Sequence, residues 1–99
     1  MMNESNNQIM DILQEEAAEV IQAVSKVRRF GMDNAKHGEG PTNREHLEEE
    51  LGDMLAMIDI LMEMDFVSWG NVNAAKRKKI EKLKKWSTIY ESENLEKAA

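Results

Sequence analysis

The sequence has no cysteine, a single proline and only 5% aromatic residues among its 99 positions. The absence of cysteine excludes disulfide bonds and thiolate–metal sites. No segment combines β-branched residues with strict alternation, so no strand is expected. No apolar run approaches the ~20 residues of a membrane span, and the first residues do not resemble a signal peptide. We therefore expect a cytoplasmic protein with no membrane partner.

Residues that favour helices are abundant instead. Glu, Lys, Leu, Ala and Met are all good helix formers, and Met alone occurs eight times. A chain of this length is expected to form one domain over residues 1–99, and so small a domain buries a limited fraction of its surface alone. The composition therefore predicts an all-α fold for which oligomerisation is an ordinary means of stabilisation.

Hydrophobic periodicity predicts three helices, over about residues 6–30, 43–64 and 71–91, with a turn over residues 65–70. Gly31 is a natural stop for the first helix. Thr42 and Glu45 have the spacing of a capping box, which starts the second helix. Both long helices have wide apolar faces. We expect two long antiparallel helices plus a third, completing a four-helix-type bundle through oligomerisation.

The net charge of −6 is unevenly distributed. Residues 76–85 hold seven basic groups and one acidic group, so this segment is +6 and the rest of the chain is −12. An acidic body with one basic stretch is not typical of a nucleic-acid binder, and no nucleic-acid partner is expected. The basic stretch suits phosphate binding, although a solvated helix face with long Lys stems is its alternative interpretation.

Two acidic pairs interrupt the apolar stripes of the long helices. Glu16 and Glu19 lie in the first helix, Glu50 and Asp53 in the second, and each pair has the i, i+3 spacing that puts side chains next to each other. Burial of an ionised carboxylate is costly unless it is paired or bound to a metal. Because Mg²⁺ prefers oxygen ligands and also takes substrate phosphates, the two pairs indicate a Mg²⁺–phosphate site. Solvated acidic faces are the alternative.

The acidic pairs belong to two motifs, Glu15-Glu16-x-x-Glu19 and Glu50-x-x-Asp53. Together these motifs resemble the signature of the MazG-like, all-α nucleoside triphosphate pyrophosphohydrolases, in particular the short members of phage and mobile-element type. The resemblance covers roughly residues 9–87. It implies a homodimer or homotetramer that hydrolyses (deoxy)nucleoside triphosphates to the monophosphate and pyrophosphate with Mg²⁺, for which Mn²⁺ can substitute.

The resemblance also implies roles for individual residues. By position, it implies the metal ligands Glu16, Glu19, Glu50 and Asp53. Glu15 fills the first position of the motif, as a water-activating base or as a group that supports the ligands. On the third helix, the resemblance implies substrate-binding roles for Asn73, Lys76 and Lys79. The basic run around Lys76 leaves open which side chain contacts phosphate.

Two other functions are compatible with parts of the pattern. A non-catalytic helical homodimer, acting as an interaction or regulatory module, predicts that the four acids are exposed and replaceable. A nucleic-acid binder that uses the Lys-rich helix predicts salt-dependent binding to any duplex. The sequence does not reveal the preferred base or sugar, or the number of metal ions.

Overall fold

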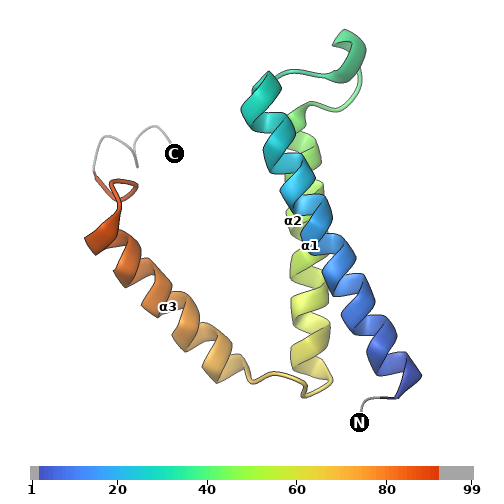
Figure 1. Cartoon of the computed structure of the whole chain (residues 1–99), viewed down its shortest axis with the longest axis vertical. Coiled ribbons are helices and arrows are strands. Elements are labelled where there is room, and N and C mark those ends of the chain that lie inside the picture. Colours follow the sequence, from blue (N-terminus) through green and yellow to red (C-terminus); the bar gives the residue numbers. More distant parts are fainter. Residues whose placement is uncertain (1–2, 92–99) are drawn as a thin grey trace. The chain divides into compact units, whose positions relative to one another are not determined.

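The computed structural model describes residues 3–91 and is all-helical in that range, as the sequence predicts. Its elements are α1 (Glu4–Phe30), the short 3-10 turn η1 (Lys36–Gly38), α2 (Asn43–Glu63) and α3 (Trp69–Trp86) (Figure 1). Within residues 3–91, the only β-type pairing is an isolated bridge between Ala35 and Thr42. No helix of this range has the length and hydrophobicity to cross a bilayer. The chain divides into two compact units after Met64.

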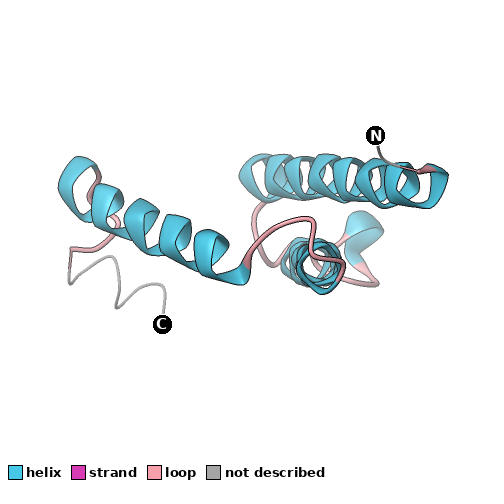
Figure 2. Cartoon of the chain, turned by 90° about the horizontal axis from the view of Figure 1, so that it is seen from below, coloured by secondary structure: helices cyan, strands magenta, loops and turns pink. Residues whose placement is uncertain are grey.

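In the first unit, α1 and α2 form an antiparallel hairpin. They lie side by side in Figure 1, and Figure 2 shows α2 end-on against α1. In the described part of the chain, the buried apolar residues are only Ala23, Met57 and Leu61. The interior of the hairpin is therefore a very small core, which leaves much of both apolar stripes outside it.

Hydrogen bonds tie the α1–α2 connection to both helix ends. Gly31 ends α1 with a φ of 91°, a left-handed conformation that glycine adopts without strain, and its N–H donates to the Val27 carbonyl at 2.8 Å. The buried side chain of Asn43 donates through Nδ2 to the Gly31 carbonyl at 2.9 Å. The Asn43 backbone N–H donates to the Asn34 carbonyl at 2.9 Å. The start of α2 is thereby held against the end of α1.

The predicted capping box is present at the start of α2. The Thr42 N–H donates to Glu45 Oε1 at 3.0 Å, and the Glu45 N–H donates to Thr42 Oγ1 at 3.2 Å. The backbone hydrogen bond from Thr42, followed by the bond from its hydroxyl, lowers the pKa of the Glu45 carboxyl because both favour its charged form. This cap sets the first residue of α2, and hence the face on which each later residue lies.

In the second unit, α3 begins earlier and ends earlier than the sequence pattern predicts. Ser68 caps its start, because its Oγ accepts the Asn71 N–H at 3.2 Å. The predicted end near residue 91 is wrong. Ser87 has an extended backbone (φ −142°), and its Oγ donates to the Leu83 carbonyl at 2.7 Å. This side-chain bond competes with continuation of the helix, which stops at Trp86.

Candidate metal centre

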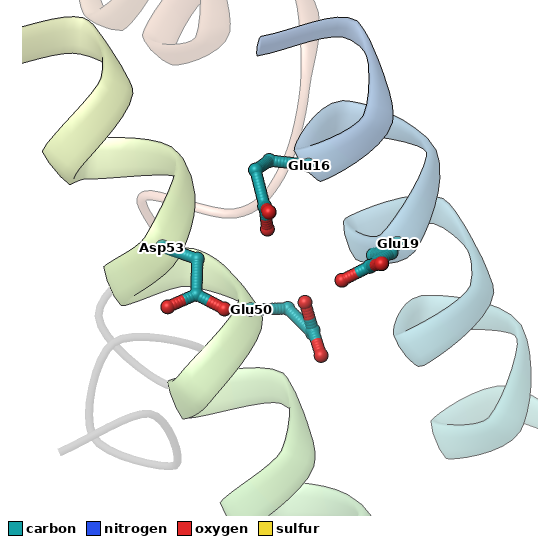
Figure 3. A group of neighbouring side chains, drawn as sticks. All are labelled: Glu16, Glu19, Glu50 and Asp53. Atoms are coloured by element: carbon teal, nitrogen blue, oxygen red, sulfur yellow. The ribbon is translucent and has the colours of Figure 1, made fainter. Parts of the chain in front are cut away.

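Four carboxylates, two from α1 and two from α2, point toward one another between the helices (Figure 3). They belong to Glu16, Glu19, Glu50 and Asp53. One carboxylate oxygen of each lies within 4.8 Å of the corresponding oxygens of the other three. Oxygen atoms that bind one Mg²⁺ at about 2.1 Å lie up to about 4.2 Å apart, so small side-chain rotations would suffice to place them around one ion.

Local helix geometry and the hairpin together produce this convergence. The i, i+3 spacing puts Glu16 beside Glu19 on α1, and the same spacing puts Glu50 beside Asp53 on α2. The antiparallel packing of α1 on α2 then brings the two pairs opposite each other. The structure therefore brings together all four residues that the sequence suggests as ligands, while their role as ligands stays a prediction.

Two oxygens of this carboxylate cluster are buried without a partner. Glu16 Oε2 and Glu50 Oε2 have no hydrogen-bond partner among the described residues. Glu16, Glu19 and Glu50 are half-buried, and Asp53 is exposed. Three of these four side chains are therefore too buried for the alternative interpretation, in which the acids lie on solvated helix faces. An unsatisfied buried acceptor costs free energy that a bound cation would remove, so the donor set fits a divalent metal.

The pKa values of two members of the cluster, Glu50 and Glu16, are raised. The pKa of Glu50 rises to about 7, first through a hydrogen bond with the Glu19 side chain, then through burial and through the negative charges of Glu19, Asp53 and Glu16. Burial, followed by the charges of Glu19, Asp53 and Glu15, raises the pKa of Glu16. Each cause disfavours the carboxylate form, so protons and metal ions compete for the same oxygens.

Within residues 3–91, no basic side chain forms an ion pair with the carboxylate cluster. The ion pairs found within residues 3–91 join Arg44 to Asp33 and Lys84 to Glu81, each at 3.2 Å. Neither pair includes a member of the cluster. In the described part of the chain, the four acids thus lack the protein cation that usually accompanies partly buried carboxylates, which again fits a metal as their counter-charge.

The other predicted site residues lie outside this cluster. Glu15 is exposed on α1 and is not among the four converging carboxylates. Asn73 is half-buried on α3, and Lys76 and Lys79 are exposed on the same helix. Because α3 belongs to the second unit, the substrate-binding role of these three residues stays a prediction.

A pocket at the loop end of the hairpin was missed by the sequence reasoning. This hairpin-loop pocket has a volume of about 510 Å³. Its wall includes Lys26, Phe30, Asn34, Lys36, Asn43 and His46. The loop itself matches no recognisable motif, but the positions of two pocket residues along the helices could have indicated the pocket. Lys26 and His46 fall on the same helix faces as Glu19 and Glu50, seven and four residues away.

Residues 4–87 match the family model described as the MazG nucleotide pyrophosphohydrolase domain. The match includes all three helices and both acidic pairs. Neither the curated proteins nor the solved structures contain a match to the chain.

Proposed function

Because the chain belongs to the MazG nucleotide pyrophosphohydrolase domain family, we propose that it hydrolyses (deoxy)nucleoside triphosphates to the monophosphate and pyrophosphate with Mg²⁺. The observation that carries this proposal is the cluster of four carboxylates with two buried, unpartnered oxygens. Mn²⁺ is expected to substitute for Mg²⁺. Since the family match spans both units, residues 1–99 are proposed to act as one domain.

The carboxylate cluster is proposed to hold the metal. The ligands would be Glu16, Glu19, Glu50 and Asp53. A metal bound there would neutralise charge that develops on the phosphate oxygens and would lower the pKa of a coordinated water. The exposed Asp53 lies at the solvent side of the cluster, whereas the other three carboxylates are half-buried. This arrangement leaves an approach from solvent for a triphosphate.

Glu15 is proposed to serve as the general base. Its carboxylate is exposed and does not belong to the metal cluster, so it is free to accept a proton from a water molecule. Attack of that water on the α-phosphorus forms one P–O bond and breaks the bond to the bridging oxygen. Pyrophosphate then leaves, and the monophosphate keeps the oxygen of the water. Glu16, the next residue along α1, belongs to the cluster, so base and ligand are adjacent in sequence.

Basic and amide side chains of α3 are proposed to bind the phosphates. Asn73, Lys76 and Lys79 follow one another at intervals of three residues, so they share one side of the helix. Each Lys offers three donors on a flexible stem and acts as a point charge toward phosphate. The positive charge of residues 76–85 complements the triphosphate, whose charge the acidic cluster alone would repel.

The exposed apolar residues of the hairpin support a homodimer or homotetramer. Ile21 and Leu55 are 70% and 61% exposed, and Val24 and Leu51 are also exposed. Full burial of such a side chain contributes about 1.5–3 kcal/mol. Given the very small core of the hairpin, association of copies is the proposed means of covering these side chains.

The alternative, a non-catalytic helical homodimer, requires exposed and replaceable acids. It is less well supported, because Glu16 and Glu50 each bury an unpartnered oxygen. A role limited to interaction gives no reason to keep these two carboxylates inside the hairpin.

The proposed function is tested by pyrophosphate release from a panel of ribo- and deoxyribonucleoside triphosphates. The full chain is assayed with Mg²⁺, with Mn²⁺ and with EDTA, beside its Glu15→Gln variant. We expect metal-dependent release that EDTA abolishes, and a fall in kcat of about 10²-fold or more in the variant. Absence of release from every triphosphate, by folded protein that binds Mg²⁺, would refute the proposed reaction. An unchanged kcat in Glu15→Gln would refute only the role of Glu15 as base.

A further inference from the structure

The hairpin-loop pocket lies along the same side of the hairpin as the carboxylate cluster. Lys26 follows Glu19 by seven residues, which is two turns or about 10 Å along α1. His46 precedes Glu50 by four residues, which is one turn or about 6 Å along α2. A nucleoside triphosphate is elongated, with its base and its phosphates at opposite ends. The spacing therefore allows one nucleotide to reach from the pocket to the cluster.

The pocket is poorly suited to bind phosphate through backbone N–H groups, although it lies at the start of a helix. An anion at a helix N-terminus needs free backbone N–H groups. In α2, the N–H groups of Asn43 and Arg44 donate to loop carbonyls at 2.9 and 2.8 Å, and that of Glu45 donates to Thr42 Oγ1. These donors are occupied, so side chains supply the polar groups that the pocket offers. A pocket whose polar groups come from side chains is better suited to the uncharged base of a nucleotide than to its phosphates.

The side chains of Lys26 and Asn43 offer complementary hydrogen-bonding groups. Lys26 is a donor without acceptor capacity, and the structure shows no ion-pair partner for it within residues 3–91. Asn43 uses Nδ2 to hold the Gly31 carbonyl, and its Oδ1 accepts no hydrogen bond from the described residues. The pocket can thus donate to a carbonyl through Lys26 and accept from an N–H through Asn43.

Phe30 provides an aromatic surface in the same pocket. This residue is 54% exposed, and the Arg29 guanidinium lies 4.8 Å from the centre of its ring. This cation–π contact occupies one face of the ring and leaves the other for a planar ligand. The pocket volume of about 510 Å³ is in the usual range for small-molecule sites.

We propose that the hairpin-loop pocket is a nucleobase subsite that selects bases with a lactam edge, in which a carbonyl stands next to a ring N–H. Guanine, hypoxanthine, uracil and thymine have this edge. Adenine and cytosine present the reverse, an amino group beside an unprotonated ring nitrogen. Lys26 donates to the carbonyl, Asn43 Oδ1 accepts the N–H, and the base stacks on Phe30. This inference rests on the proposed hydrolysis for its link to catalysis.

Pairs of substrates with matched ring size test the selection. We expect kcat/KM for dITP to exceed that for dATP, or that for dUTP to exceed that for dCTP, by about tenfold or more, because the wrong edge leaves pocket groups unpaired. Lys26→Met should reduce this ratio to about twofold or less. Arg28→Met removes a cation from the same exposed turn without altering the pocket wall, and it should keep the ratio. Circular dichroism verifies that both variants fold.

Binding of monophosphates separates this inference from the proposed reaction. Titration of dIMP against dAMP, and of dUMP against dCMP, is followed by calorimetry and by NMR shifts of Lys26, Phe30 and Asn43. Selective binding with shifts at these residues supports the subsite even if no triphosphate is hydrolysed. Three kinetic results would overturn the inference while leaving the hydrolase proposal intact. They are equal kcat/KM within both substrate pairs, a preference for dATP or dCTP, and a selectivity ratio that Lys26→Met leaves unchanged. Without hydrolysis, monophosphate binding that is unselective or leaves the three residues unshifted overturns it as well.

Discussion

Glu19 of α1 and Glu50 of α2 are joined by a hydrogen bond between their side chains across the hairpin, and this contact is the largest cause of the raised pKa of Glu50, about 7. Two carboxyl groups can share such a bond only while one of them is protonated. The raised pKa means that the contact between these two carboxyl groups favours the protonated form of Glu50, at the place where the proposed function requires a divalent cation.

The metal-free protein should lose stability as the pH rises from about 4.5 to about 7. The pKa of Glu50 is raised from 4.5 to about 7 in the folded state, so the folded chain holds a proton that the unfolded chain releases. The stabilisation is fully present below pH 4.5 and is lost as the pH passes 7. Urea unfolding in EDTA across this range measures the trend. A stability that rises steadily from pH 4.5 to 7 would contradict the raised pKa.

The Glu50→Gln variant should separate stability from activity. Gln keeps the size of the side chain and removes one negative charge from the cluster, so the melting temperature in EDTA at pH 8 should rise. Loss of a ligand should lower Mg²⁺-dependent hydrolysis at least about a hundredfold. Glu48→Gln, an exposed change on the same helix outside the cluster, should alter neither quantity. A destabilised Glu50→Gln protein in EDTA would show that the carboxylate itself supports the fold.

Removal of the charge at Lys76 should weaken substrate binding more than it slows the chemistry. Lys76→Met is expected to raise KM for the preferred triphosphate about tenfold, because one charge-assisted contact to phosphate is lost. Lys85→Met removes another exposed charge from α3, nine residues after Lys76 and therefore on the opposite side of the helix, and should change KM by less than about twofold. Equal effects of both substitutions would indicate a diffuse solvated face rather than a phosphate contact. Steady-state kinetics at fixed ionic strength provides the comparison.

A charge placed on the exposed apolar face should dissociate the oligomer. Ile21→Glu introduces a carboxylate at a position that is 70% exposed in the single chain and is proposed to be covered by another copy. Sedimentation velocity should show a smaller species, with a lower melting temperature. Gln22→Glu adds the same charge at the neighbouring exposed polar position and should leave the assembly intact. A wild-type chain that sediments as a stable monomer would contradict the proposed assembly directly.

Local signals in the sequence were sufficient for most of the fold. Gly31 ends α1 and the Thr42–Glu45 capping box starts α2, as predicted, because both devices depend on residues within one helical turn. The end of α3 was predicted less well. Apolar spacing continues to Tyr90, but the Ser87 hydroxyl bonds the Leu83 carbonyl and the helix stops. The spacing of apolar residues does not predict whether a side-chain hydrogen bond to the backbone, such as that of Ser87, will end the helix.

The sequence by itself determined the all-α class, the three helices and the pairing of acids along each helix, because a period of 3.6 residues fixes which side chains share a face. Only the tertiary structure brought Glu19 within reach of Glu50, raised the pKa of Glu50 and enclosed the hairpin-loop pocket. Those properties depend on distance and burial between residues far apart in the chain. Packing of α1 on α2 sets that distance and burial, and neither helix sets them alone.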